Sequence, residues 1–143
     1  MASLDRGARG PETIVVGVDG SEGAAAALEF AAGEAAFREA RLRVVAAWQV
    51  PVAVADADHF GSAPLDVASW DGLRVRAQQL ADDALAAARK LSPSLEGEAL
   101  TVQGGAADVL LAQCADATLI VVGRRGLGGF KSLLLGSVSQ QVV

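Results

Sequence analysis

Three glycines and a serine near the C-terminal end of the sequence have the spacing expected of a phosphate-binding site. Gly123 and Gly126 follow the apolar run 119–122, and nine residues separate Gly126 from Gly136 and Ser137. Glycine lets backbone N–H groups turn toward a ligand, because no Cβ stands in the way. Such amides at the end of a strand, just before a helix, bind phosphate oxygens. The pattern therefore predicts a nucleotide site.

The helix expected after Gly136 strengthens this prediction. Ser137 and Gln140 have the S-x-x-Q spacing of a capping box. The N–H groups of the first helical turn, the hydroxyls of Ser137 and Ser139 and the positive end of the helix then converge on one point. An anion suits this arrangement better than a neutral group. The alternative is a glycine-rich connection that only turns the chain, and the placement of Gly136 and Ser137 at a helix start disfavours it.

Two common phosphate motifs are excluded. A P-loop requires glycine directly before Lys-Ser, but Phe130 precedes Lys131 and Ser132. A dinucleotide fingerprint would follow the first strand, where the chain has only the triplet 19–21, Asp-Gly-Ser. We therefore expect a mononucleotide site of another type. Asp19 could accept from a ribose hydroxyl or an adenine amino group, or bind Mg²⁺ held by phosphates. It could equally be a turn residue before a helix, and spacing alone leaves these roles open.

Short β-branched runs alternate with helical patterns along the chain, and the segment between residues 52 and 69 is predicted to be a loop. Ser21 is a good N-cap for the first helix, and Ser92-Pro93 ends the second. The expected strands are 13–18, 42–48, 98–102 and 118–122, and the expected helices are 22–40, 70–91 and 107–114.

This alternation indicates right-handed crossovers and a parallel sheet. In such sheets ligands bind beyond the carboxyl ends of the strands, where the strand order reverses. The triplet 19–21 follows the first strand, and Gly123 to Gly126 follow the fourth. If these strands are neighbours, both loops face the same site.

Composition excludes several classes of protein. The 143 residues suit one domain, with residues 1–11 expected to be a disordered N-terminal segment. A formal net charge of −5 argues against nucleic acid as a partner. No apolar stretch approaches the roughly 18 residues of a membrane span, and no secretory signal is evident, so we expect a cytoplasmic protein. Charged side chains outside the glycine motif are expected to be solvated surface groups.

The single cysteine and the single histidine are not expected to act in the site. Cys114 lies in the apolar helix pattern and is predicted to be a buried, inert thiol. His59 lies in the loop-like segment and is predicted to be a surface residue. One cysteine and one histidine cannot build a disulfide framework or a site made of these ligands.

These motifs resemble a known family. The spacing from Gly123 to Ser137 matches the G-2x-G-9x-G-(S/T) signature of the universal stress proteins. Residues 14–21 are similar to the opening strand and V-D-G-S turn of the family, 44–48 to its second strand, and 117–142 to its closing block. The resemblance covers roughly residues 12–143, which we treat as one universal stress protein domain.

The resemblance implies a three-layer α/β sandwich with a parallel sheet in the order 3-2-1-4-5. This architecture is Rossmann-like and similar to the adenine nucleotide alpha hydrolases. Members with the glycine signature bind ATP, so the resemblance implies ATP, ADP or AMP as the ligand. A homodimer is the usual state of the family.

By position in the motif, the resemblance also assigns site residues. The adenosine end is expected near Gly17, Asp19 and Ala47, and the ribose and phosphates near Gly123, Arg125 and Gly126. The residues expected to bind the phosphate tail are Gly136, Ser137, Val138 and Ser139.

The sequence departs from the family pattern at its end. Family domains continue from the last helix into a fifth strand, whereas this sequence ends at Val143 within that helix. We therefore expect a C-terminally incomplete domain that lacks the fifth strand and leaves the fourth strand as an edge.

Three functions are compatible with these features. The first is an ATP-binding regulatory or sensor protein of the stress response with little turnover, because no general base is evident in the motif. The second is a slow ATPase or an adenylyl-transferring enzyme. The third is an interaction module that does not require nucleotide.

Overall fold

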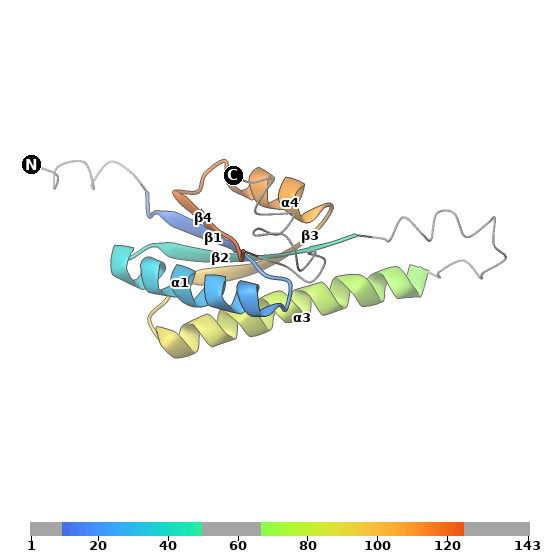
Figure 1. Cartoon of the computed structure of the whole chain (residues 1–143), viewed down its shortest axis with the longest axis horizontal. Helices are drawn as coiled ribbons and strands as arrows, with labels where there is room; N and C mark the ends of the chain where they lie inside the picture. The colour runs from blue at the N-terminus through green and yellow to red at the C-terminus, as the bar shows by residue number, and fades with distance from the viewer. Residues whose placement is uncertain (1–9, 50–66, 125–143) are drawn as a thin grey trace, which may run out of the picture.

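Four parallel strands form the central layer in the computed structural model, which describes residues 10–49 and 67–124. Their spatial order is β3-β2-β1-β4, with helices on both faces of the sheet (Figure 1). This is the predicted Rossmann-like architecture, and a fifth strand is absent from the described part of the chain. In chain order the elements are β1 (Thr13–Gly17), α1 (Glu22–Arg38), β2 (Arg41–Trp48), α3 (Val67–Leu91), β3 (Gly97–Gln103), α4 (Ala106–Gln113) and β4 (Leu119–Val121).

The predicted elements are confirmed to within a few residues. The largest difference is at the start of α3, which begins at Val67 rather than at Trp70. Most of the predicted loop, residues 50–66, lies outside the described residues. The same is true of His59 and of most of the disordered N-terminal segment that we predicted.

Strand β1 lies between β2 and β4 and forms the middle of the core. In register, Val16 pairs with Val44 of β2 and with Val121 of β4. Val15 and Val16 are fully buried, because one side chain points to each helix layer. The uninterrupted apolar run of β1 follows from this burial on both faces.

Helices α1 and α3 cover one face of the sheet and build the larger core (Figure 1). The buried positions on both helices are mostly alanine, which allows the helices to approach the strands closely. Valine, isoleucine and leucine from β1 and β2 fill the space between them. Among the described residues, this cluster contains 17 buried side chains.

Helix α4 covers the opposite face with a much smaller apolar cluster. Its buried members in the described residues are Val15, Val45, Val109 and Leu110. Side chains at the edge of the cluster, such as Ile120 and Val122, are only partly buried. This face therefore has few fully desolvated apolar contacts to hold its helix.

Helix α1 ends in a Schellman motif, a helix stop in which two backbone amides bond back to earlier carbonyls. The Ala40 N–H donates to the Ala35 carbonyl at 2.8 Å, and the Glu39 N–H donates to the Ala36 carbonyl at 3.4 Å. Glu39 has a left-handed φ of 54°, a position that glycine usually occupies. The chain then enters β2, with Ala40 buried.

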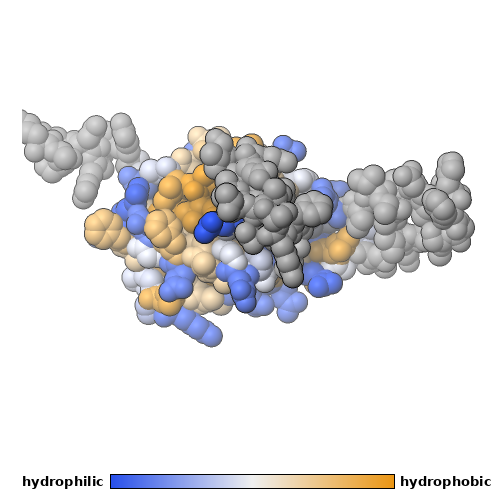
Figure 2. Space-filling view, viewed as in Figure 1, coloured by the Kyte–Doolittle hydropathy of each residue, from blue (hydrophilic) through white to orange (hydrophobic). Residues whose placement is uncertain are grey.

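Two aromatic side chains on α1 remain in solvent. Phe30 is 57% exposed and Phe37 is 87% exposed. Figure 2 shows hydrophobic residues interspersed with hydrophilic ones on the face seen in Figure 1. Among the described helices, none combines the length and the apolar character needed to cross a membrane.

Candidate nucleotide site

The exits of β1 and β4 lie side by side. The two strands pair in parallel, with Ile14 opposite Leu119 and Val16 opposite Val121. Strand β1 connects through α1 to β2 on one side, and its other neighbour, β4, follows α4. The strand order therefore reverses between β1 and β4, where ligands of such sheets bind. This confirms the predicted adjacency of the two strands.

The loop after β1 is a tight, hydrogen-bonded turn into α1. The Asp19 carboxylate accepts from both the backbone N–H and the hydroxyl of Ser21. The Ser21 hydroxyl in turn accepts from the Ala24 N–H at 3.1 Å, so Ser21 is the predicted N-cap. Gly20 has φ +83°, which disfavours any residue with a Cβ. Asp19 thus organises the turn at an exposed position, and a ligand contact by this carboxylate remains a prediction.

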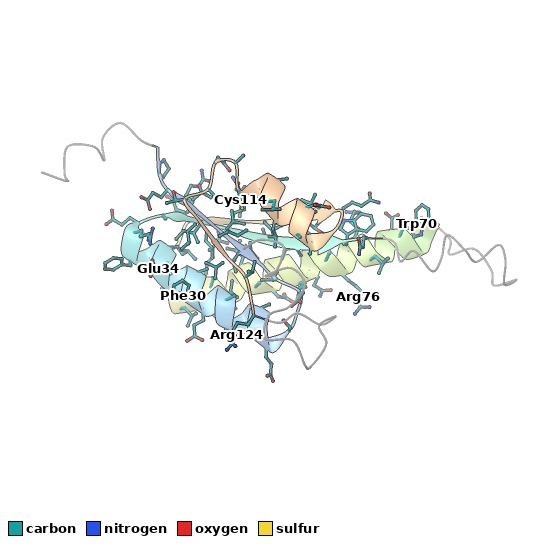
Figure 3. All side chains as sticks on the ribbon, turned by 45° about the horizontal axis from the view of Figure 1, so that its top comes forward. Phe30, Glu34, Trp70, Arg76, Cys114 and Arg124 are labelled. Atoms are coloured by element: carbon teal, nitrogen blue, oxygen red, sulfur yellow. The ribbon has the colours of Figure 1, made fainter. Side chains whose placement is uncertain are left out.

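Gly123 brings the end of β4 against the start of α1. A Cβ at this position would lie 2.6 Å from the Gly23 carbonyl carbon and 3.0 Å from the Ala24 nitrogen. Both neighbours are backbone atoms, so no side-chain rotation could relieve the contact. Figure 3 shows the next residue, Arg124, beside the N-terminal half of α1. The first motif glycine is therefore required for packing, and this packing brings the two exits together.

Gly17 and Ala47 lie on the α4 side of the sheet. A Cβ at Gly17 would be 2.8 Å from Cδ1 of Leu110 on α4, so the missing side chain makes room for this leucine. Ala47, near the end of β2, packs against the same small cluster. The predicted adenosine end thus has small residues on two adjacent strands, with Leu110 of α4 packed against the first of them.

The remaining predicted site residues are outside the part of the chain that the structure describes. The structure therefore does not test the roles assigned to Arg125, Gly126, Gly136, Ser137, Val138 and Ser139. Of the ten predicted residues it places four, namely Gly17, Asp19, Ala47 and Gly123. It gathers these four at the carboxyl ends of β1, β2 and β4.

The described residues hold no preformed metal site. Within residues 10–49 and 67–124, no three His, Cys, Asp or Glu side chains cluster closely enough to bind a cation. Asp19 is a single carboxylate, so a Mg²⁺ ion there would need phosphate and water oxygens as its other ligands.

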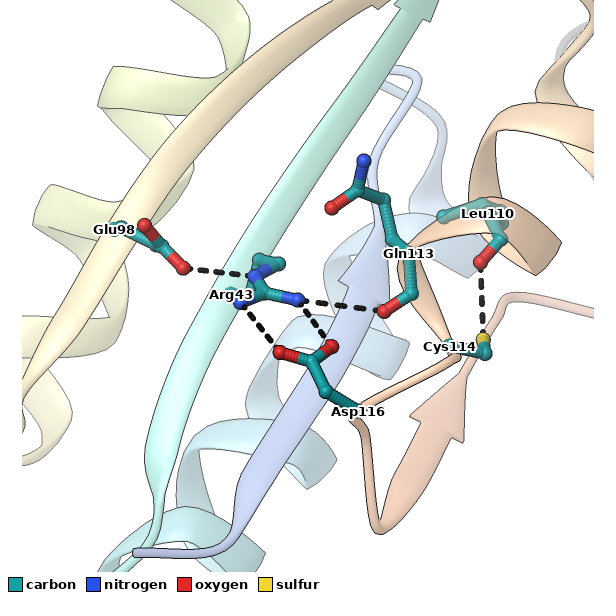
Figure 4. A network of polar contacts seen from close by, with 6 residues as sticks. All are labelled: Arg43, Glu98, Leu110, Gln113, Cys114 and Asp116. Atoms are coloured by element: carbon teal, nitrogen blue, oxygen red, sulfur yellow. Dashed lines mark hydrogen bonds and ion pairs between the residues drawn. The ribbon is translucent and has the colours of Figure 1, made fainter. Parts of the chain in front are cut away.

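The sequence analysis did not predict a polar cluster that lies at the C-terminal end of α4 (Figure 4). Arg43 of β2 donates from Nε to Glu98 of β3 at 2.7 Å. Its two terminal nitrogens donate to the two carboxylate oxygens of Asp116 at 2.9 and 3.3 Å, and one of them also donates to the Gln113 carbonyl at 3.3 Å. The side chain of Arg43 is only 16% exposed. The expectation that charged residues outside the motif are solvated is therefore wrong for Arg43.

The cluster shifts the pKa values of its members. The hydrogen bonds that Arg43 donates to Asp116 and Glu98 raise its pKa above the ordinary value, although burial opposes this. The hydrogen bond and charge of Arg43 lower the pKa of Asp116. A usable signal was present in the sequence. Arg43 stands at an inward-facing position of a strand, and a buried arginine needs carboxylate partners.

Cys114 is less buried than predicted. It is half-buried at the end of α4, because the helix stops at Gln113 and leaves the thiol at the margin of the small cluster. The thiol donates to the Leu110 carbonyl at 2.9 Å. Burial raises the pKa of the Cys114 thiol, and the negative charge of Asp116 adds to this effect. A raised pKa disfavours the reactive thiolate, and the inertness of this thiol stays a prediction.

Comparison with known proteins supports the reading of this fold. The model of the universal stress protein family matches residues 11–143. The chain is 38% identical to a universal stress protein of Thermus aquaticus over 134 residues, which is 92% of this chain and 90% of that protein. It is 30% identical to a universal stress protein of Mycobacterium tuberculosis over 90% of its own length, but it spans only 40% of that relative.

Two similar solved structures are complexes with a nucleotide. A universal stress protein in complex with cAMP has a TM-score of 0.63 and 27% identity, and the match covers 92% of this chain and 88% of that chain. The universal stress protein from Archaeoglobus fulgidus in complex with dAMP has a TM-score of 0.59 and 28% identity, over 92% and 88%. Together with the family match, these findings show that the chain belongs to the universal stress protein family.

Proposed function

We propose that this chain binds an adenine nucleotide, with ATP as the full ligand, and acts as a regulatory or sensor domain in the stress response. The observation that carries the proposal is the parallel pairing of β1 with β4, which brings the Asp19 turn and Gly123 to one edge of the sheet. Related structures in complex with cAMP and dAMP support adenine, a pentose and one phosphate as the recognised parts.

In this proposal the described residues receive the nucleoside. The base lies on the α4 side, near Gly17 and Ala47 and beside the Leu110 side chain that packs against Gly17. Asp19 accepts from the ribose or the base, or holds Mg²⁺ that arrives with the phosphates. Gly123, Arg125 and Gly126 line the ribose and phosphates, and Gly136, Ser137, Val138 and Ser139 bind the phosphate tail through N–H groups and hydroxyls.

Low turnover is part of the proposal. Asp19 is committed to the turn before α1, where its carboxylate accepts two hydrogen bonds from Ser21. A general base must reach the proton that it abstracts, and such local bonds compete with that role. Binding rather than hydrolysis is then the signal. We also propose that the protein is cytoplasmic and forms homodimers, as the family resemblance implies.

Isothermal titration with AMP and ATP tests the proposal. Wild-type protein is expected to bind both with a saturable heat. Gly126→Asp and Gly136→Asp should each abolish binding, because a carboxylate there would repel the phosphates. Gly72→Asp is the matched control, since Gly72 lies on α3 with no atom within 4 Å of its would-be Cβ. Wild-type protein that gives no heat with either nucleotide at high concentration would contradict the proposal.

Two further measurements separate the alternatives. A slow ATPase would release phosphate and an adenylyl transferase pyrophosphate, and loss of that release in Lys131→Ala would favour an enzyme. An interaction module that needs no nucleotide would melt at the same temperature with and without ATP. Nucleotide at 100 times Kd is instead expected to stabilise the folded state by about 2.7 kcal/mol.

A further inference from the structure

We propose that Arg43 is a positioning residue of the nucleotide site, because it holds α4 in the place where Leu110 packs against Gly17. This inference rests on the proposed function. Arg43 lies at the amino end of β2, on the same face of the sheet as Val45 and Ala47. Its hydrogen-bond partners include none of the predicted site residues that the structure describes, so it acts through the helix.

The first step is the anchoring of α4 at its C-terminal end. Arg43 donates to the Gln113 carbonyl at 3.3 Å, where the helix ends and its dipole is negative. The paired bonds to Asp116 fix the turn that follows the helix. The bond to Glu98 ties the same guanidinium to β3. One side chain therefore joins the end of α4 to two strands (Figure 4).

The second step is the weakness of the other forces on α4. The helix has only eight residues, about 12 Å long. Its N-cap, Gly105, makes no side-chain capping bond. Its buried valine and leucine, Val109 and Leu110, meet only two buried strand residues in the described cluster. The polar anchor is therefore a large part of what determines where the helix sits.

The third step links the anchor to the site. Leu110 occupies the space that a side chain at residue 17 would fill, 2.8 Å from the would-be Cβ. Leu110 is one turn before the anchored end, and its carbonyl also accepts from the Cys114 thiol. A shift of the helix end would therefore move Leu110 relative to the β1 exit. That shift would change the apolar surface beside the proposed position of the adenine base.

The experiment compares AMP affinity in full-length variants. Arg43→Met keeps most of the aliphatic stem but loses all four bonds, and we expect at least a roughly 5-fold increase in the Kd for AMP. Asp116→Asn should have a smaller effect, and Asp116→Glu should restore binding. Arg38→Met is the matched control, because Arg38 forms an ion pair with Glu34 at 2.9 Å on α1, away from α4. Its Kd should equal that of the wild type.

A spectroscopic readout separates positioning from general stability. The Leu110 methyl resonances of ligand-free protein should shift in Arg43→Met and stay unchanged in Arg38→Met. An unchanged Kd or unshifted Leu110 methyls in a folded Arg43→Met protein would overturn the positioning role alone. Should Arg43→Met not fold, Asp116→Asn provides the same comparison with the Arg43–Glu98 pair intact. A wild-type protein that binds neither AMP nor ATP would overturn the proposed function, and the positioning role with it.

Discussion

The two faces of the sheet are held in different ways. On the α1 and α3 face, a continuous apolar cluster of 17 buried residues fixes both helices, among the residues that the structure describes. On the α4 face, a cluster of four buried apolar residues and one half-buried arginine hold one short helix. The first face is stabilised mainly by burial, which is not directional. The second depends on a few directional bonds, so single substitutions there should move the helix without unfolding the domain.

The largest expected effect comes from the larger face. Leu42 is fully buried, and Leu42→Ala should lower the free energy of unfolding by about 3–5 kcal/mol, because the tightly packed cluster cannot close the cavity. Leu110→Ala on the smaller face should cost about 2–3 kcal/mol, since its surroundings are partly open. Urea titration of both variants measures the difference. Equal losses would show that the two faces are packed alike.

The next prediction concerns Gly123, where the end of β4 contacts α1 beside the proposed site. Gly123→Ala should destabilise the protein by about 1–3 kcal/mol and weaken AMP binding, because the new Cβ meets backbone atoms of α1. Gly33→Ala is the control on the same helix, where no atom lies within 4 Å. It should stabilise the protein by about 0.5–1 kcal/mol. A Gly123→Ala protein as stable as the wild type would remove the packing argument for this glycine.

The equivalent change on the smaller face should be milder. In Gly17→Ala the new Cβ meets the flexible side chain of Leu110 rather than backbone. We expect a loss of about 1–2 kcal/mol, and a smaller loss when Leu110 is also replaced by alanine. A double-mutant cycle by urea denaturation measures this coupling. Strict additivity of the two substitutions would contradict the contact.

A small gain in stability is expected from a substitution at Glu39, the C-cap residue of helix α1. Glu39→Gly should raise the free energy of unfolding by about 0.5–1 kcal/mol, because glycine adopts the left-handed φ of 54° without steric strain. Thermal unfolding measures the gain. Arg41→Gly, in the extended strand that follows, is the opposite control and should destabilise the protein. A lower melting temperature for Glu39→Gly would rule out strain at this position.

The smallest effect concerns the pH dependence of the smaller face. Arg43 lowers the pKa of Asp116, so this carboxylate stabilises the fold above its ordinary pKa of about 3.9. The stabilisation is lost as the pH falls through the still lower pKa of the folded state. Asp116→Asn should therefore be less stable than the wild type at pH 7, and the difference should shrink at pH 3. A difference that does not change with pH would contradict the ion pair.

The sequence was sufficient for the helices and strands and insufficient for the contacts between them. Uninterrupted β-branched runs and alanine-rich helices carry a strong periodic pattern, so β1, β2 and α1 were predicted to within two residues. The contact of Gly123 with Gly23, by contrast, joins residues 100 positions apart and leaves no local pattern. For Arg43 the strand pattern indicates an inward-facing position, but its partners Glu98 and Asp116 come from other elements. Their bonds depend on strand order and helix placement.

The most direct test of the account is a titration of AMP into ¹⁵N-labelled protein, observed through the backbone amides. If the nucleotide binds at the neighbouring exits of β1 and β4, the amides of Asp19, Gly20 and Gly123 will show saturable shifts. The amide of Phe37, at the distant end of α1, will not shift. The absence of saturable shifts would contradict nucleotide binding at these exits, and so would shifts confined to residues away from them.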